Sequence, residues 1–385
     1  MAERLIPNYR REIRKALPAE LFKPEYGSFL WLPFHLTVIG LCLWGIVAYP
    51  RWFTLPIFTL MIGHSFGCLG FLAHDSAHGG AVKAIWLRDI IAGVCFSPMG
   101  IGPYLWRRWH NAEHHNNTQI EGVDPDHLFT IEDYQKNPVL RWLYRIPPLM
   151  RNLIVFGSFT FRMTQQTWRM MITYLRSPKS TAMNKFTILF QWFLQTGFWV
   201  ALTASLGVNA LIFGYIIPVL IANVVVISYI ATNHFLNPLA DESDVLGTSL
   251  SVTLPKWLGW LDAMHMRFGA HVAHHLFPQA SPMQSRKIEE KVAEMYPDRF
   301  HQMPIHLALK KLWDTPWVYE DHHTLIDPNR GVRAGTLGYG LDNPTKPRRT
   351  ANREVKDRAK AIRKQNRRMK RDARRQAKLK QTVSK

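Results

Sequence analysis

The sequence has few cysteines, and their spacing forms no recognisable motif. Its three cysteines, Cys42, Cys68 and Cys95, lie in apolar stretches, and no two are spaced as Cys-x-x-Cys. This pattern argues against a disulfide-stabilised scaffold and against a cysteine-ligated zinc site. The region after Met1 also lacks a short apolar run followed by a small-residue cleavage site, so we expect no secretory signal.

Charge is absent from long stretches of the chain and concentrated near its end. The chain has 385 residues, is 47% hydrophobic and has a formal net charge of +20. Residues 346–385 contain 18 Lys or Arg and 3 Asp or Glu, so this basic tail carries +15 of that charge. The remaining body has long apolar runs, which excludes a soluble basic globule as the simplest interpretation.

Four apolar stretches are long enough to cross a membrane. About 20 helical residues, each rising about 1.5 Å, span a hydrocarbon core of roughly 30 Å. The connections within the first and second pairs of stretches are very short. We therefore predict an all-α integral membrane protein with four transmembrane helices in two hairpins. The predicted spans are residues 29–49, 53–73, 186–206 and 208–231.

The distribution of arginine and lysine predicts the orientation of these spans. The N-terminal segment 1–27, the central region 76–185 and the basic tail are rich in both residues, whereas the two hairpin turns contain only Arg51. Cytoplasmic loops carry the excess of positive residues in membrane proteins. We therefore expect both termini and both large polar regions on the cytoplasmic side.

The polar regions are expected to form a cytoplasmic helical cap on a membrane domain that covers residues 28–320. Residues 85–105 are apolar but interrupted by charges, prolines and glycines, so we expect them to lie partly at the interface, with a fifth span as the alternative. A capping box that begins at Ser281, with proline at the first helical position, predicts a helix ending near Met295. Residues 321–345 are interpreted as a linker to the tail.

Nine of the 17 histidines fall into three motifs and one single position. Side chains three or four residues apart on a helix share one face, so their imidazoles can converge on one metal ion. In an adjacent His-His pair the second residue turns about 100° and can reach a neighbouring ion. Nine imidazoles exceed the shell of one zinc ion and suit two ions. The nine are His74, His78, His110, His114, His115, His234, His271, His274 and His275.

Each motif taken alone also fits surface histidines that are held by backbone carbonyls. All four groups nevertheless emerge on the same predicted side of the four-helix bundle, which favours one shared metal centre. The affinity of imidazole for divalent metals does not by itself select iron, because the Irving–Williams order favours copper.

At these motifs the chain resembles the integral-membrane fatty acid desaturases, over roughly residues 30–320. The sequences HDSAHG, HNAEHHNN and HVAHHLFP are similar to the three histidine boxes of that family, and His234 occupies the place of its additional histidine. The resemblance implies that the nine histidines bind two non-haem iron ions, which activate O₂ and remove two hydrogens from an acyl chain. Some relatives have an asparagine four residues before the additional histidine, where this chain has Ile230.

Several residues near the boxes are candidates for supporting roles. Four carboxylates are candidates to orient imidazole N–H groups, with helix capping or turns as the alternative: Asp75, Glu113, Asp124 and Asp126. His64 lies ten residues before His74, which places it about 15 Å deeper in the membrane if the segment is helical. For His64 we favour an interhelical hydrogen bond over a role in lining a substrate tunnel. Glycines 63, 67 and 70 fit close helix packing. Five further histidines are interpreted as ordinary surface residues: His265, His301, His306, His322 and His323.

The resemblance implies that the substrate is a fatty-acyl lipid or thioester. A methylene offers no polar handle, so its attack needs an oxidant made from O₂ at a metal. An apolar tunnel would hold the acyl chain, with about 0.8 kcal/mol from each buried CH₂ group. No region resembles a fused b-type cytochrome or ferredoxin, so a separate electron donor of either kind is expected. We expect the basic tail to bind anionic membrane lipid, with an acidic partner as the alternative and nucleic acid disfavoured.

Two other functions compete with a desaturase. A related di-iron hydroxylase or ketolase, acting on an alkane, sterol or carotenoid, would use the same metal chemistry, although the first and third boxes favour a desaturase. A non-enzymatic metal carrier or haem electron carrier would place its polar ligands inside the spans. The boxes here lie beyond the predicted spans, which disfavours such a carrier.

Overall fold

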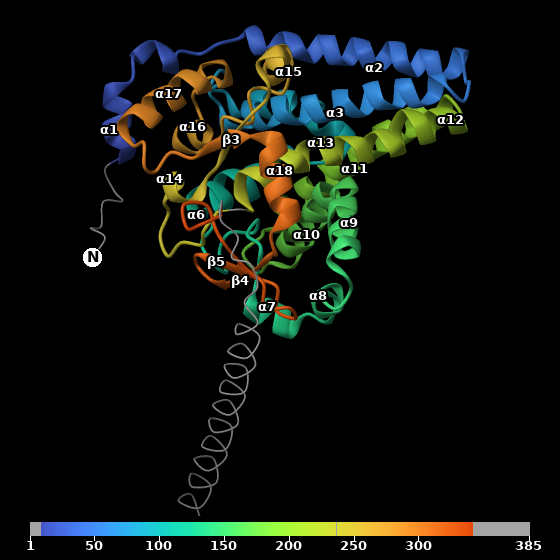
Figure 1. The fold of residues 1–385 in the computed structure, drawn as a ribbon. Coiled ribbons are helices and arrows are strands. Elements are labelled where there is room, and N and C mark those ends of the chain that lie inside the picture. The colour runs from blue at the N-terminus through green and yellow to red at the C-terminus, as the bar shows by residue number, and fades with distance from the viewer. Residues whose placement is uncertain (1–8, 236, 342–385) are drawn as a thin grey trace, which may run out of the picture.

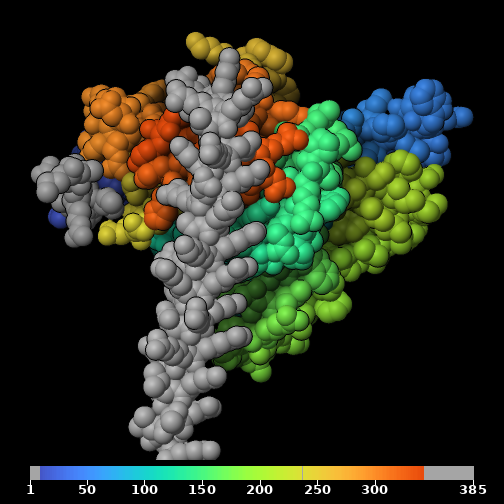
Figure 2. Space-filling model, turned by 60° about the horizontal axis from the view of Figure 1, so that its bottom comes forward, coloured from blue at the N-terminus to red at the C-terminus, as the bar shows by residue number. Residues whose placement is uncertain are grey.

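The computed structural model describes residues 9–235 and 237–341, so the predicted basic tail lies outside the described residues. The described chain is mostly helical, with two small sheets beside the helices (Figure 1). The long helices extend together to one side, and the shorter elements gather around their other end. Figure 2 shows the same division, with blue and yellow-green parts of the long helices at one side of the molecule.

Among the described residues, four helical stretches are long and apolar enough to cross a membrane, as the sequence predicts. The first stretch, Gly27–Ala48, contains α2 (Trp31–Ala48), and the second and third are α3 (Thr54–His78) and α11 (Ala182–Ser205). The fourth stretch is Val208–His234. It consists of α12 (Val208–Leu211), a π-helical turn (η6, Ile212–Ile216) and α13 (Ile217–His234). α3 continues five residues beyond the predicted span and ends at Gly79, whose φ of 76° is the left-handed conformation typical of a helix C-terminus. The first histidine box is therefore the last turn of a spanning helix.

Close packing of α3 against α13 depends on small residues. A Cβ atom at Gly63 would lie 2.6 Å from the Cβ of Ile221, and one at Gly67 would lie 3.1 Å from Val225. Side chains at these two positions would push the helices apart, so glycine allows the backbones to approach. The position of α13, and of His234 at its end, follows from this contact.

The segment expected at the membrane interface is bent rather than straight. Ile85–Met99 and Pro103–Asn117 are long and apolar enough to cross a membrane only when taken together, and they meet at an angle of 100°. Gly100, at the bend, has a φ of 65°. The elements of this segment are α4 (Ile85–Phe96), η3 (Ser97–Met99), α5 (Pro103–Trp106), a π-helix (η4, Arg107–His114) and α6 (His115–Asn117).

Short helices form the rest of the body. The predicted helix after Ser281 is confirmed, since the Ser281 hydroxyl accepts a hydrogen bond from the Met283 N–H and α17 ends at Met295. The remaining helices are α1 (Tyr9–Ala16), η1 (Ala19–Phe22), η2 (Gly27–Leu30), α7 (Ile131–Lys136), α8 (Pro138–Leu143), α9 (Pro148–Gly157), η5 (Ser158–Thr160), α10 (Arg162–Arg176), α14 (Val245–Thr248), η7 (Lys256–Leu258), α15 (Gly259–Met264), α16 (His271–Leu276), η8 (Pro282–Gln284), α17 (Ser285–Met295) and α18 (Ile305–Asp314).

Two small sheets tie distant parts of the chain together. In the larger one, β1 (Phe129–Thr130) pairs in parallel with β4 (Val318–Asp321), followed by antiparallel β5 (Thr324–Ile326) and β6 (Arg333–Gly335). In the smaller one, β2 (Ser251–Thr253) pairs in parallel with β3 (Gln302–Pro304).

The structure differs here from the expectation of a linker over residues 321–345. Strands β5 and β6 belong to the larger sheet, and Ile326 is buried. Arg151 and Asp327 also form a buried ion pair at 2.5 Å. Strands of three residues leave almost no alternating pattern in a sequence, and their partners lie far away along the chain.

Candidate metal centre

The structure brings the nine predicted histidines together from four segments. His74 and His78 lie in the last turns of α3, and His234 ends α13. The second box lies on η4 and α6, and the third on α16. Eight of the nine side chains are buried, and His274 is half-buried.

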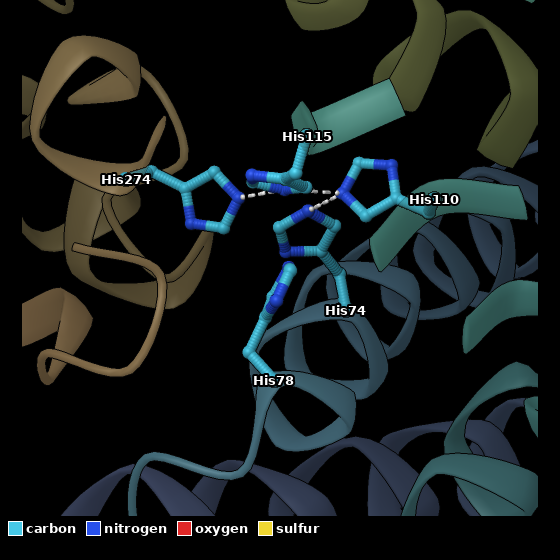
Figure 3. A group of neighbouring side chains, drawn as sticks. All are labelled: His74, His78, His110, His115 and His274. Carbon is cyan, nitrogen blue, oxygen red and sulfur yellow. Dashed lines mark hydrogen bonds between the residues drawn. The ribbon is translucent and has the colours of Figure 1, made fainter. Parts of the chain in front are cut away.

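Five of the imidazoles form a first cluster: His74, His78, His110, His115 and His274 (Figure 3). Each contributes one ring nitrogen, and these nitrogens all lie within 4.8 Å of one another. The Nε2 atom of His110 is 2.8 Å from that of His74 and 3.0 Å from that of His115. The Nε2 atoms of His115 and His274 are 3.1 Å apart.

The other four imidazoles form a second cluster beside the first. Ring nitrogens of His114, His234 and His275 lie within 4.8 Å of one another. The Nε2 atom of His271 joins them, at 2.7 Å from that of His234 and 3.0 Å from that of His275. The rings of His115 and His275 stack with centroids 4.3 Å apart, which places the clusters side by side.

The helix type decides which histidine belongs to which cluster. Ordinary α-helical spacing predicts that His110 and His114 converge and that His115 reaches the neighbouring ion. Residues Arg107–His114 instead form a π-helix, whose i to i+5 hydrogen bonds widen the turn. His110 and His115 therefore share a cluster and His114 joins the other, so each cluster receives side chains from the second and third boxes.

The nitrogen geometry fits metal ligation better than hydrogen bonding. A neutral imidazole nitrogen either donates or accepts, so the Nε2 of His110 cannot form ideal bonds to two neighbouring Nε2 atoms at once. Metal–nitrogen bonds of about 2.1 Å place neighbouring ligand nitrogens about 3.0–3.4 Å apart, close to the observed separations. Within the described residues, the buried His78 Nε2 has no hydrogen-bond partner, as expected for an atom that faces an ion. The donor set is therefore suited to two ions that bind imidazole.

Burial keeps the imidazoles of the third box neutral. Desolvation, followed by the neighbouring imidazoles, lowers the pKa of His271, His274 and His275 well below the ordinary value. A neutral ring offers its lone pair to a metal, whereas an imidazolium does not. The buried position of the box thus prepares it for metal binding.

His114 differs because carboxylates face it. Burial lowers the pKa of His114, but the charges of Asp124 and Asp126 outweigh that effect and raise the pKa to about 9. Its Nδ1 lies 2.9 Å from Asp124 Oδ1 and 3.6 Å from Asp126 Oδ2. The carboxylates hold a proton on Nδ1, and the second proton, on Nε2, would leave when an ion binds there. The result would be the usual arrangement of a metal-binding histidine with a carboxylate behind it.

The four predicted carboxylates separate into two pairs. Asp124 is buried and accepts hydrogen bonds from the backbone N–H groups of Gln119 and Asp126, so it both shapes the turn and contacts His114. Glu113 instead accepts a hydrogen bond from the Tyr174 hydroxyl. Within the described residues, no hydrogen bond joins Asp75 or Glu113 to any of the nine histidines. Each directly precedes or follows a box histidine on its helix and therefore points to a different side of the helix.

A cavity of about 270 Å³ adjoins both clusters. Side chains from both clusters contribute to its wall, among them His74, His110, His114, His234 and His271. Most of the remaining lining is apolar and includes Phe96, Met99, Ile101, Ile227 and Ile230, while α10 contributes Arg162, Gln166 and Arg169. An apolar segment of a substrate in this cavity would therefore lie next to the imidazole clusters.

Comparison with known proteins agrees with this geometry. Residues 50–306 match the family model described as fatty acid desaturase. The chain belongs to the fatty acid desaturase family. This membership identifies it as an oxidoreductase and confirms the resemblance at the histidine boxes.

The desaturase is also similar to individual relatives over most of its length. It is 27% identical over 324 residues to an sn-1 acyl-lipid omega-3 desaturase (ferredoxin) of Synechocystis, covering 81% of this chain and 89% of the relative. An enzyme of the same name from Nostoc is 24% identical over 315 residues, or 80% and 85% of the two chains. A chloroplastic omega-3 fatty acid desaturase of Brassica napus is 22% identical over 317 residues, or 77% and 76%.

Two polar residues after the second box were not predicted to support the site. The Thr118 hydroxyl lies 3.2 Å from His275 Nδ1, opposite the nitrogen that faces the second cluster. The Gln119 side-chain amide donates to the carbonyl of His234 at 2.5 Å. Both contacts cross more than 100 residues of sequence, so no local pattern indicates them.

The interpretation of His265 as a surface residue is wrong. His265 is only 5% exposed, and its Nε2 lies 2.9 Å from the Nε2 of His64. The hydrogen-bond partner expected for His64 therefore exists, but it comes from the end of α15 rather than from another spanning helix. The flanking residues Met264, Met266 and Phe268 are apolar, but no spacing pattern marks the single histidine among them as buried.

Proposed function

We propose that the desaturase inserts a double bond into the acyl chain of a membrane lipid, with O₂ as co-substrate, at a di-iron centre. The observation that carries the proposal is the pair of adjoining imidazole clusters on one apolar cavity. Family membership and the names of the acyl-lipid relatives support the reaction and the substrate class.

The nine histidines would hold the two iron ions. The first cluster, His74, His78, His110, His115 and His274, would bind one ion, and the second, His114, His234, His271 and His275, would bind the other. When bound, the iron pair supplies the oxidising power that removal of hydrogen from a saturated chain requires. Asp124 fixes the His114 ring, and Thr118 faces the outer nitrogen of His275.

The cavity would bind the acyl chain and keep water away from it. Its isoleucine, methionine and phenylalanine lining gives each enclosed CH₂ group about 0.8 kcal/mol of transfer free energy. Arg162 and Arg169 of α10 add positive charge to the lining, which suits the polar part of a glycerolipid. Ile230 also lines this cavity, so the apolar residue found where some relatives have asparagine faces the same space as the substrate.

We propose a ferredoxin as the electron donor, because the Nostoc and Synechocystis relatives carry that donor in their names. A b-type cytochrome is the alternative. A soluble donor would approach the side of the molecule where the boxes lie, because lipid would cover the membrane-spanning parts of the helices.

We further propose that the spans form two hairpins, with the histidine-bearing cap and both termini in the cytoplasm. The first box ends α3 and His234 ends α13, so the two helix ends meet at one side of the bundle. The excess of arginine and lysine in the connecting regions supports this orientation. The membrane domain, expected from the sequence over residues 28–320, would also include strands β5 and β6. The basic tail would bind anionic lipid or an acidic partner.

Fatty-acid profiling of cells that express the chain tests the reaction. We expect a new unsaturated product with the unmodified chain and none with a variant carrying His274→Ala and His275→Ala. His306→Ala, at an exposed histidine outside both clusters, is the matched control and should keep the product. Unchanged double-bond content with a new hydroxylated product would instead support the related hydroxylase function.

A further inference from the structure

Two helices between the second box and α11 expose apolar side chains on their outer side. These helices are α9 and α10, which follow one another in the chain. Their exposed apolar residues recur every four positions, so each row lies on one side of its helix. We call these residues the outer face: Leu149, Met150, Leu153 and Ile154 on α9, and Trp168 and Ile172 on α10. Exposed apolar patches of this kind mark interaction surfaces.

The polar side chains of α9 point inward, opposite to the arrangement expected for a helix at the surface of a soluble protein. Arg151 is buried and pairs with Asp327 at 2.5 Å. The Asn152 side-chain amide donates to the carbonyl of Trp313 at 2.7 Å. A helix that faces water turns its apolar side inward and its charged side outward. The reversed arrangement of α9 therefore indicates apolar surroundings.

A pair of hydrogen bonds places the start of α10 below the membrane surface. The Thr164 N–H donates to Asn223 Oδ1 at 3.0 Å, and the Asn223 side-chain amide donates to the Thr164 hydroxyl at 3.0 Å. Asn223 lies eight residues inside the predicted span 208–231, which is about 12 Å from the end next to the boxes. Thr164 must therefore lie at a depth where lipid surrounds the spans.

A second contact gives a similar depth for the middle of α10. The rings of Trp168 and Trp192 pack with centroids 5.0 Å apart. Trp192 lies six residues, or about 9 Å, inside the predicted span 186–206. The preceding helix, α9, runs across the direction of α2 and α3 rather than along it (Figure 1). The two helices therefore lie beside the spans near the membrane surface.

The charges around α9 and α10 suit a lipid surface with anionic headgroups. Residues 134–240 contain no Asp or Glu. Exposed positive side chains flank the two helices, with Arg145 before α9 and with Arg176 and Lys179 at and after the end of α10. Anionic lipid leaflets attract basic residues that lie close to them.

We propose that α9 and α10 lie in the plane of the bilayer, with the outer face among the lipid acyl chains. Interfacial amphipathic helices bury their apolar side about 5–10 Å into the boundary between headgroups and acyl chains, close to the depth that both contacts give. The bilayer suits this face better than a protein partner does, because lipid must already surround the neighbouring spans. The next span, α11, also exposes apolar side chains near its contact with α10, among them Phe190 and Phe193.

In this position α10 would separate the bilayer from the cavity. Its Arg162, Gln166 and Arg169 side chains line the cavity beside the clusters, whereas Trp168 and Ile172 belong to the outer face. A lipid substrate would then pass from the bilayer into the cavity around α10 without entering water. This consequence rests on the proposed function, but the position of the helices does not.

Fluorescence quenching measures the depth of the outer face in the iron-loaded full chain. Cys42, Cys68 and Cys95 are buried, so a cysteine introduced at the surface can be labelled selectively. Leu153→Cys carrying a fluorophore is reconstituted into vesicles of phosphatidylcholine and phosphatidylglycerol. We expect lipid brominated on its acyl chains to reduce the fluorescence at least twofold, and iodide in the water to leave it unchanged. Glu294→Cys, at an exposed position of α17, is the control and should show the reverse.

Two results would overturn the proposal. If iodide quenches the label on Leu153→Cys and brominated lipid does not, α9 faces water. If neither quencher reaches this label, protein covers the outer face, as a second copy of the chain or another partner would. Ile172→Cys tests α10 in the same way, and Met150→Cys replaces Leu153→Cys if that variant does not retain iron. Because desaturation is not the readout, failure here leaves the proposed function untouched.

Discussion

The Nε2 atoms of His115 and His274 lie 3.1 Å apart, although 159 positions separate the two residues in the sequence. His115 begins α6, and His274 lies on α16, whose Val272 and Leu276 side chains are buried against α14 and α17. The packing of α16 therefore sets the distance between the second and third boxes. A change in either segment should affect the same metal centre.

Asp124→Asn should weaken metal binding without unfolding the protein. The substitution keeps the size of the side chain but removes the charge that faces His114 Nδ1. Loss of such a supporting carboxylate typically costs 10- to 100-fold in metal affinity. We expect this loss in a titration of the iron-loaded protein with a chelator.

Glu113→Gln is the control for that experiment. Glu113 is adjacent in sequence to His114, but its carboxylate accepts a hydrogen bond from Tyr174 and contacts none of the proposed ligands. Its iron retention should match that of the unmodified chain. Equal losses in the two variants would contradict the positioning role of Asp124.

Gly63→Ala should destabilise the bundle, because the new Cβ would lie 2.6 Å from the Cβ of Ile221 and 3.0 Å from the carbonyl of Pro218. Overpacking of this kind typically costs about 1–3 kcal/mol. The apparent unfolding temperature in detergent should fall accordingly. Gly40→Ala on α2 is the matched control, since a Cβ there meets no atom within 4 Å. A similar decrease in both variants would show that helix packing at Gly63 is not the cause.

The spans and the identity of the clustered histidines could be predicted from the sequence because their signals are local. Charge-free runs of about 20 residues specify membrane helices, and histidines at helical spacing specify a common face. The split of the second box could not be predicted, since the π-helix that pairs His110 with His115 leaves no pattern in the residues themselves.

Contacts between distant segments account for the other differences. His265 becomes buried through a turn at Met266 and Arg267 that residue preferences oppose. Residues 324–326 become a strand only because Val318 and Tyr319 pair with them. In both cases tertiary structure overrides local preference, and a single sequence carries no record of the partner.

Glu289 should make the stability of the desaturase depend on pH. Burial raises the pKa of Glu289 to about 7, even though Arg286 and Ser251 favour the ionised form. Because the folded-state pKa lies above the ordinary value, the folded protein favours the protonated Glu289 side chain. The stability that this protonated side chain contributes is complete below about pH 4.5 and is lost as the pH rises through 7. The contribution should be about 1–3 kcal/mol.

The measurement is the apparent unfolding temperature of the iron-loaded chain between pH 5 and pH 8, a range that covers most of the loss. We expect a decrease with rising pH that is smaller in Glu289→Gln, whose side chain does not ionise. Glu294→Gln, at an exposed position on the same helix, should retain the dependence of the unmodified chain. An identical profile in all three proteins would exclude Glu289 as the titrating group.

Ile227→Trp should block the substrate cavity while leaving the metal ligands in place. Ile227 lies on α13, is 3% exposed and contributes to the wall beside the clusters. A larger ring would occupy space that the acyl chain needs, so we expect at least a tenfold loss of unsaturated product with unchanged iron content. Leu220→Trp on the exposed side of the same helix is the control and should keep both. Full activity in Ile227→Trp would mean that the acyl chain reaches the iron centre by another route.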